Sequence, residues 1–315
     1  MLRTGLGMAL AAVLMVLPAG AADKLAEYTY QDTKDLVSLV EDAAQRIETV
    51  GDAAFAEFGK PGSRWLNNET YLFAYAPDGT AAFHPVSPEL VGKNVIDLKD
   101  LNGKLLVQEI VDVAKLDAPD ANRWVFYLWQ DQRELSPIWK ASYIRKAITP
   151  EGKVYLIGSG LYDVKVEKAF VTRRVNRAVE LLQSAGKEEA FRQFRDSASP
   201  FVFLGTYVFV LSETGETLVD PAFPNLSGRN MLGFRDAVGF EPIRQLVDKL
   251  KTADEAWVQF LWPEPGAVVP SRKLVYARKV TVNGETLIVG SDFYIATPIW
   301  MKVEEVSPWR QNQPG

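Results

Sequence analysis

Apolar residues recur at helical spacing in two long segments of the chain, residues 32–58 and residues 167–195. In the first segment they are Leu36, Leu39, Val40, Ala43, Ala44 and Ile47, and in the second they are Phe170, Val171, Val175, Ala178, Val179 and Leu182. Intervals of three and four residues place each set along one face of a helix. The pattern therefore predicts two amphipathic helices, each with one side against a core.

A strand pattern follows the first helix. Tyr71, Phe73 and Tyr75 alternate with aliphatic residues, so their side chains share one face of a strand. Residues 77–80 (Pro-Asp-Gly-Thr) predict a hairpin turn, because proline fixes φ and glycine accepts the left-handed position. We expect a return strand at 81–84, a loop with a short helix at 87–114, and strands at 124–130, 141–148 and 154–160.

The same order of elements occurs twice. A shift of 136 aligns residues 71–75 with 207–211 and Gly92 with Gly228. The shift falls to 133 where Trp124 and Trp129 align with Trp257 and Trp262, and to 132 where Gly158-Ser159 aligns with Gly290-Ser291. A slowly drifting shift is what deletions in loops produce within an internal repeat.

The predicted fold class is α+β, with two tandem PAS-like modules, each an N-terminal helix packed on an antiparallel sheet of about five strands. We place module 1 at residues 22–165 and module 2 at residues 166–303. Residues 304–315 are expected to be a disordered tail that carries no functional information.

The first residues predict a secretory signal peptide over residues 1–21. Arg3 gives a positive start, an apolar stretch spans residues 6–17, and small residues surround the expected cleavage site at Ala21 or Ala22. The alternative, a membrane anchor, needs about 20 apolar residues, which this stretch does not reach. The sequence shows no further membrane span, so we expect a soluble, exported protein in the periplasm.

Composition narrows the function classes. The chain has 315 residues, 47% of them hydrophobic, and a net charge of −5 without a basic run, which disfavours nucleic acid as a partner. It contains no cysteine and a single histidine. These counts exclude disulfides, a cysteine nucleophile and a His/Cys zinc set. We predict no cofactor, no metal site and no catalytic residue, and therefore no enzyme.

Several motifs in module 1 resemble the extracellular Cache sensor family, in its type-2 single form. They lie at residues 78–80, 84–85, 87–94, 97–100 and 102–104, then at 124–129, 140–145 and 158–163, and they occur in the family's order. Module 2 keeps the frame with looser motifs. The resemblance implies sensing of small molecules outside the cytoplasm, often short carboxylates. It also implies a membrane receptor, kinase or transporter as partner, because the expected soluble chain lacks the spans and output domain usual in the family.

The expected ligand pocket of module 1 combines donors with aromatic walls. A buried carboxylate needs a cation or several donors to replace water, and we assign this task to His84, Lys140 and Tyr143. Tyr71, Phe73, Tyr127 and Trp129 are the expected walls, although packing in the core is an alternative for each aromatic residue. Lys140 and Tyr143 are three apart, so they can face one cavity only if the strand bulges or Lys140 lies in the loop before it.

Module 2 changes the chemistry at aligned positions. Asp220 replaces His84, Phe260 replaces Tyr127 and Val275 replaces Ser142. An acid would repel a carboxylate, so we expect module 2 to bind a different ligand, such as an amine, or none. Its candidate residues are Tyr207, Asp220, Trp262, Lys273 and Tyr276. Two functions stay open for the whole chain: a periplasmic small-molecule binding protein, or a structural or protein-interaction module whose pocket is vestigial.

Overall fold

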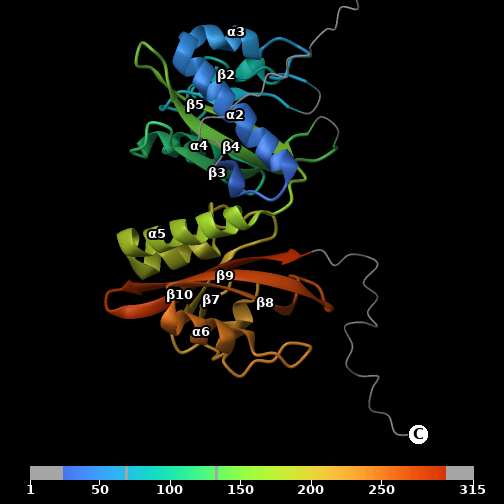
Figure 1. The fold of residues 1–315 in the computed structure, drawn as a ribbon, viewed down its shortest axis with the longest axis vertical. Coiled ribbons are helices and arrows are strands. Elements are labelled where there is room, and N and C mark those ends of the chain that lie inside the picture. Colours follow the sequence, from blue (N-terminus) through green and yellow to red (C-terminus); the bar gives the residue numbers. More distant parts are fainter. Residues whose placement is uncertain (1–23, 68–69, 132–133, 296–315) are drawn as a thin grey trace, which may run out of the picture.

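The computed structural model describes residues 24–67, 70–131 and 134–295. The predicted signal peptide at 1–21, the tail at 304–315 and the end of module 2 lie outside this range. Two halves with separate sheets make up the described chain, and Figure 1 shows them one above the other along the longest axis. No helix in the described part is long and apolar enough to cross a membrane.

The first half contains one long helix and a five-stranded antiparallel sheet. Its elements are α2 (Gln31–Val50), η1 (Gly51–Ala53), α3 (Ala54–Phe58), β1 (Phe73–Tyr75), β2 (Ala81–Phe83), η2 (Pro88–Leu90), α4 (Leu106–Val111), η3 (Asp112–Lys115), β3 (Asn122–Trp129), β4 (Ile138–Ile148) and β5 (Val154–Tyr162). The strand order is β2-β1-β5-β4-β3. The strands predicted from the sequence are confirmed, with boundaries shifted by a few residues. The helix predicted over 32–58 is present but divided, because α2 ends before Gly51, whose φ is 62°, and α3 follows after η1.

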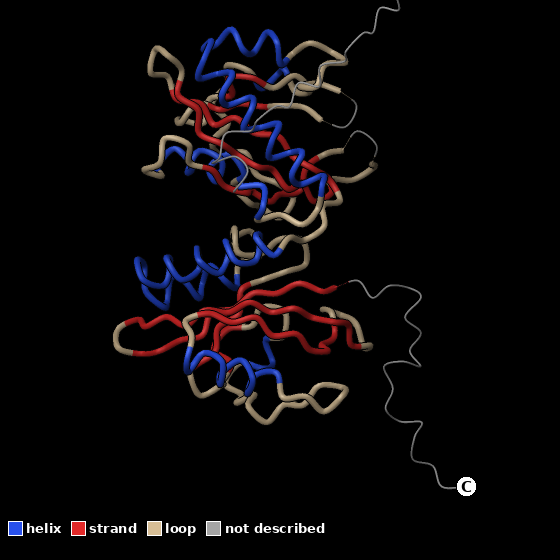
Figure 2. Tube along the Cα trace, in the orientation of Figure 1, coloured by secondary structure: helices blue, strands red, loops and turns tan. Residues whose placement is uncertain are grey.

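The second half repeats this order. Its elements are α5 (Lys168–Arg195), β6 (Val208–Ser212), β7 (Thr217–Val219), η4 (Pro224–Leu226), α6 (Pro242–Thr252), β8 (Glu255–Pro263), β9 (Pro270–Val282) and β10 (Glu285–Ile295), with strand order β7-β6-β10-β9-β8. Helix α5 is interrupted at Gly186, whose φ of 80° glycine adopts without strain. Both predicted helices and the two antiparallel sheets of the α+β class are thus present, and Figure 2 shows the two sheets in red.

Each sheet is covered on both faces. In the first half, α2 packs on one face through a core that contains Val40, Ala44 and Tyr143, while α4 covers the other face above Tyr127 and Ile144. In the second half α5 and α6 take these two positions, and α5 lies between the two sheets (Figure 1). Alternation along each strand therefore divides its side chains between two faces of the sheet. We call the face against the long helix α2 or α5 the helix face, and the face against the shorter helix α4 or α6 the cavity face.

Aromatic and charged contacts join the halves. The ring of Phe126 on β3 stacks on Phe203, with 3.7 Å between centroids. Lys104 is buried and donates to the backbone carbonyls of Phe126, at 2.7 Å, and Val202, at 3.3 Å. Apolar stacking combined with satisfied polar groups is what a fixed interface requires.

Candidate functional site

A small cavity lies on the cavity face of the first sheet. Its free volume for a water-sized molecule is about 10 Å³, and it is lined by Tyr71, Phe73, Tyr75, His84, Leu106, Tyr127 and Trp129. This is about the space that one water molecule needs, so side chains nearly fill the cavity in this conformation. Five of these residues were predicted as pocket residues: Tyr71, Phe73, Tyr127 and Trp129 as aromatic walls on shared strand faces, and His84 as a donor. Leu106 comes from α4, and its packing against the sheet is a long-range contact that no local pattern indicates.

Lys140 places a buried ammonium group beside this cavity. In the sheet it pairs with Tyr127 on one side and Tyr162 on the other, and it is 1% exposed. Its Nζ donates a hydrogen bond of 2.6 Å to the Tyr71 hydroxyl and lies 4.0 Å from the centroid of that ring. The ammonium therefore reaches the cavity through Tyr71, which forms part of the wall.

Burial dominates the electrostatics of Lys140. Desolvation lowers its pKa from 10.5 to about 7, against a smaller raising effect of the Asp131 charge. Among the residues that the structure describes, no carboxylate forms an ion pair with this ammonium. Lys273, which occupies the aligned position in the second half, does form one, with Asp292. A buried cation without a paired counter-charge is costly, and an anionic ligand would remove that cost.

His84 offers a second polar group to the cavity. Its Nδ1 is buried and has no hydrogen-bond partner within the described chain. Burial, and to a lesser extent the charge of Lys140, lowers its pKa to about 4, so the imidazole is neutral at physiological pH. The ring stacks on Phe73 with centroids 6.0 Å apart. A neutral imidazole with an unmet nitrogen can donate to a ligand or accept from it, depending on the tautomer.

Two glycines on β5 leave room for neighbouring side chains, Gly160 for polar ones on β4 and Gly158 for apolar ones. A Cβ on Gly160 would lie 2.4 Å from Ser142 Oγ and 2.5 Å from Lys140 Cε. Ser142 Oγ in turn lies 2.9 Å from the Tyr127 hydroxyl. A Cβ on Gly158 would lie 2.6 Å from Ile144 Cδ1 and 2.9 Å from the Phe73 ring. The Gly-Ser-Gly segment of β5 thus serves close packing around the site.

Tyr143 does not line this cavity, so its prediction as a pocket donor was wrong. Strand β4 pairs with β5 without a bulge from Lys140 to Ile148, and residues three apart therefore point to opposite faces. Tyr143 packs against α2 and donates a hydrogen bond of 2.7 Å to Glu41. Tyr276 behaves in the same way in the second half, where it lies on the helix face and donates to Glu255 at 2.7 Å.

The equivalent cavity of the second half has apolar walls. Its free volume for a water-sized molecule is about 40 Å³, and Asp220, Trp262 and Lys273 line it together with aliphatic and aromatic residues. Tyr207 contacts this group, because Lys273 Nζ lies 3.1 Å from its hydroxyl. Burial raises the pKa of Asp220, whose Oδ1 accepts the backbone N–H groups of Ala222 and Phe223. Four of the five candidates in this half are therefore brought together.

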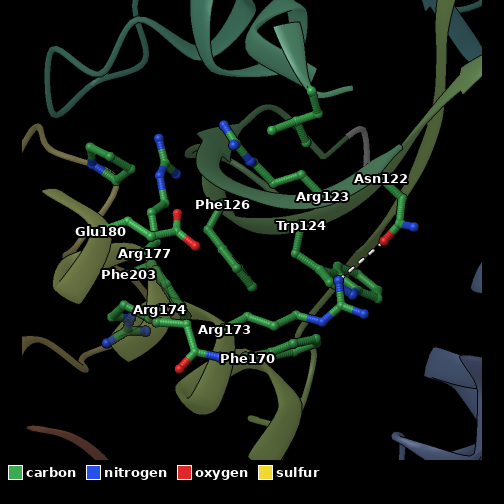
Figure 3. A pocket seen from close by; sticks show the side chains of 13 residues that line it. Asn122, Arg123, Trp124, Phe126, Phe170, Arg173, Arg174, Arg177, Glu180 and Phe203 are labelled. Atoms are coloured by element: carbon green, nitrogen blue, oxygen red, sulfur yellow. Dashed lines mark hydrogen bonds between the residues drawn. The ribbon is translucent and has the colours of Figure 1, made fainter. Parts of the chain in front are cut away.

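A larger cavity between the halves was not predicted from the sequence. It is lined by Leu116, Asn122, Arg123, Trp124, Phe126, Phe170, Arg173, Arg174, Asn176, Arg177, Glu180, Pro200 and Phe203, and Figure 3 shows the arginines around the aromatic rings. Arg173 pairs with Glu27 at 2.8 Å and Arg177 with Glu109 at 2.6 Å. Because carboxylates already balance Arg173 and Arg177, these two guanidinium groups do not by themselves define an anion site.

Comparison with known proteins assigns the family. The Cache domain model dCache_2 matches residues 61–297, which is most of the chain and includes both sheets. The chain therefore belongs to the Cache domain family of ligand-sensing domains, which is typically extracellular or periplasmic and occurs in chemoreceptors. The Cache family expected from the motifs is confirmed, whereas its type-2 single form in two tandem copies stays a prediction, because one family model spans both halves.

Similar proteins include chemotaxis receptors. The chain is 27% identical to methyl-accepting chemotaxis protein McpP of Pseudomonas putida over 150 residues, which are 44% of this chain and 27% of the relative. The chain thus spans about a quarter of the length of this curated relative.

Solved structures with similarity include sensor domains. A periplasmic sensor domain of a chemotaxis protein is 25% identical with a TM-score of 0.31 and covers 41% of this chain and 87% of its own. A Cache chemosensory domain described for carboxylic acid recognition is 21% identical with a TM-score of 0.34, over 40% and 86% of the two chains. A methyl-accepting chemotaxis protein of Vibrio parahaemolyticus is also 21% identical with a TM-score of 0.34, over 46% and 97%.

Proposed function

We propose that the first half binds a small organic carboxylate through Lys140. The observation that carries this proposal is a fully buried ammonium group that forms no ion pair with any described residue and lies beside an aromatic cavity. A ligand carboxylate would accept from Lys140 Nζ in a charge-assisted hydrogen bond, which is stronger than a neutral one. The hydrogen bond from Lys140 Nζ to the Tyr71 hydroxyl would break or be shared with the ligand. His84 would supply the second polar contact to the ligand.

The walls limit the ligand's size and shape. Phe73, Tyr75 and Trp129 enclose the space next to His84. Because the free volume is about 10 Å³ in this conformation, these rings would have to move apart to admit a short-chain acid, whose carbon atoms would then contact them. Longer acids would require α4 to move, because Leu106 closes the cavity from that side.

We further propose that the two halves are tandem copies of one module, residues 22–165 and 166–303, acting in the periplasm after cleavage of a signal peptide. Identical strand order and equivalent lysine–tyrosine bonds in both sheets support this. The ligand-bound first module would be presented to a membrane receptor, kinase or transporter. In this scheme the second module fits the alternative role of a structural or protein-interaction unit, because Asp292 already neutralises its buried lysine.

A thermal-shift screen tests the binding proposal. The chain is heated with acetate, propionate, lactate, pyruvate, small dicarboxylates or amino acids, with sodium chloride at matched ionic strength as control. A ligand at 100 times its Kd stabilises the native state by about 2.7 kcal/mol, which corresponds to a rise in Tm of several degrees. We expect at least one short carboxylate to raise Tm, and Lys140→Ala to abolish that rise. An unchanged Tm across the panel would favour the scaffold role.

A further inference from the structure

Position 292 carries an acid where the first half has glycine. In the first sheet Gly160 pairs with Ser142, two residues after Lys140. In the second sheet Asp292 pairs with Val275, two residues after Lys273. The registers therefore place Gly160 and Asp292 at equivalent positions of the two sheets, and we call this position the node.

Neighbouring hydrogen bonds support this equivalence. Lys140 donates to the hydroxyl of Tyr71, and Lys273 donates to the hydroxyl of Tyr207. The serine before the node, Ser159 or Ser291, donates at 2.7 Å to the backbone carbonyl of the same tyrosine in its half. Because these hydrogen bonds are the same in both halves, the surroundings of the node are alike. The two sites therefore differ at the node in whether the residue carries a carboxylate.

Asp292 supplies a counter-charge inside the protein. Lys273 Nζ lies 2.9 Å from Asp292 Oδ2, and the two side chains are 5% and 0% exposed. The contact is an ion pair rather than a well-aligned hydrogen bond, since neither carboxylate oxygen has a hydrogen-bond partner in the described chain. Burial raises the pKa of Asp292, and the positive charges of Lys273 and of Arg174 from α5 counteract this effect.

The two lysines thus differ in the negative charge that surrounds them. Lys140 lies near a neutral His84 and against Gly160, with the Asp131 charge as a weaker influence. Lys273 faces Asp292 and, across the second cavity, Asp220. Because an ion pair in low dielectric is strong and an unpaired buried charge is costly, the first lysine favours an added anion and the second does not.

We propose that Asp292 is a built-in occupant of the second site and that the residue at this node decides which half binds an anion. The Asp292 carboxylate gives Lys273 the charge that a ligand carboxylate would give Lys140, a comparison that rests on the proposed function of the first half. The second site is then a latent carboxylate site, closed by its own side chain. Replacing that side chain with glycine opens the site.

The test transfers binding from one half to the other in the full chain. Lys140→Met silences the first site, and Asp292→Gly is added to this background. Propionate is titrated by calorimetry, with sodium chloride at equal ionic strength as control. We expect the Lys140→Met variant to show no heat of binding, and the double variant to bind propionate with a Kd at least about tenfold lower than any residual value.

Matched variants locate the gained site. Adding Lys273→Met to the double variant should remove the binding again, because the cation is gone. Asp292→Asn removes the charge but keeps the volume, so it should bind propionate more weakly than Asp292→Gly. A folded double variant that gains no binding, or that keeps it after Lys273→Met, overturns the proposal.

Loss of folding also gives a decisive result. Removing Asp292 leaves Lys273 buried without its partner, which is strongly destabilising. If the double variant is unfolded, propionate should restore its circular dichroism spectrum where chloride does not, and failure to do so overturns the proposal. Wild-type binding that survives Lys140→Met would instead contradict the proposed function of the first half, so the two ideas can fail separately.

Discussion

The affinity for a short carboxylate should depend on pH through Lys140. Its pKa in the free protein is about 7, and binding requires the charged form. The affinity scales with the protonated fraction, which is about 0.9 at pH 6 and about 0.01 at pH 9 for a group with this pKa. We therefore expect Kd to rise roughly 100-fold between these pH values.

Other groups near the ammonium keep one charge state over this range. His84 stays neutral above its pKa of about 4, and burial raises the pKa of Tyr71 well above the usual value. Asp131 raises the pKa of Lys140 and so counteracts part of the effect of burial. The ligand itself is ionised throughout, because carboxylic acids titrate near pH 4.

Calorimetry in buffers of different ionisation enthalpy measures both the affinity and the proton uptake. Near pH 9 we expect close to one proton bound per ligand, and near pH 6 almost none. Tyr143→Phe is the matched control, since Tyr143 lies on the helix face and its removal should leave the pH profile unchanged. An affinity that is constant from pH 6 to 9, without proton uptake, would refute the role of Lys140.

Three further results are expected. Lys140→Met should raise the free energy of unfolding at pH 6, measured by urea denaturation, by up to about 5 kcal/mol, because lysine titrates near 10.5 when unfolded but near 7 here. The unfolded chain then binds more protons between pH 7 and 10.5, so wild-type stability rises with pH in this window and the gain from the variant disappears above it. Gly160→Ala should lower the Tm and weaken carboxylate binding at least tenfold, because its Cβ would lie 2.4 Å from Ser142 Oγ; normal affinity would exclude close packing at this point. Tyr143→Phe should cost about 1 kcal/mol of unfolding free energy, since it removes the bond to Glu41, and leave the affinity at a given pH unchanged.

Periodicity explains why so much of the fold could be predicted. The apolar faces of α2 and α5 and the alternating aromatics of β1 are local patterns, and each predicted element is present near its expected place. The cavity walls followed from the same alternation. Tyr143 shows the limit: its resemblance to a pocket donor came from its residue type, whereas the regular pairing of β4 turns it to the helix face.

Contacts distant in sequence could not be predicted. The bond between Lys140 and Tyr71 joins residues 69 positions apart, and the arginine-lined cavity needs both halves in place. Asp292 is different, because the shift of 132 already aligns it with Gly160. Its meaning depends on the sheet register, which brings its carboxylate to 2.9 Å from Lys273.

A crystal structure of the chain with propionate at saturating concentration tests the central claim most directly. We predict a carboxylate oxygen about 2.7–2.9 Å from Lys140 Nζ, as in charge-assisted hydrogen bonds, with the ethyl group against Phe73 and Trp129. The second cavity should hold no anion, because Asp292 still pairs with Lys273. Propionate bound only among the arginines between the halves, or an empty first cavity, would contradict the account.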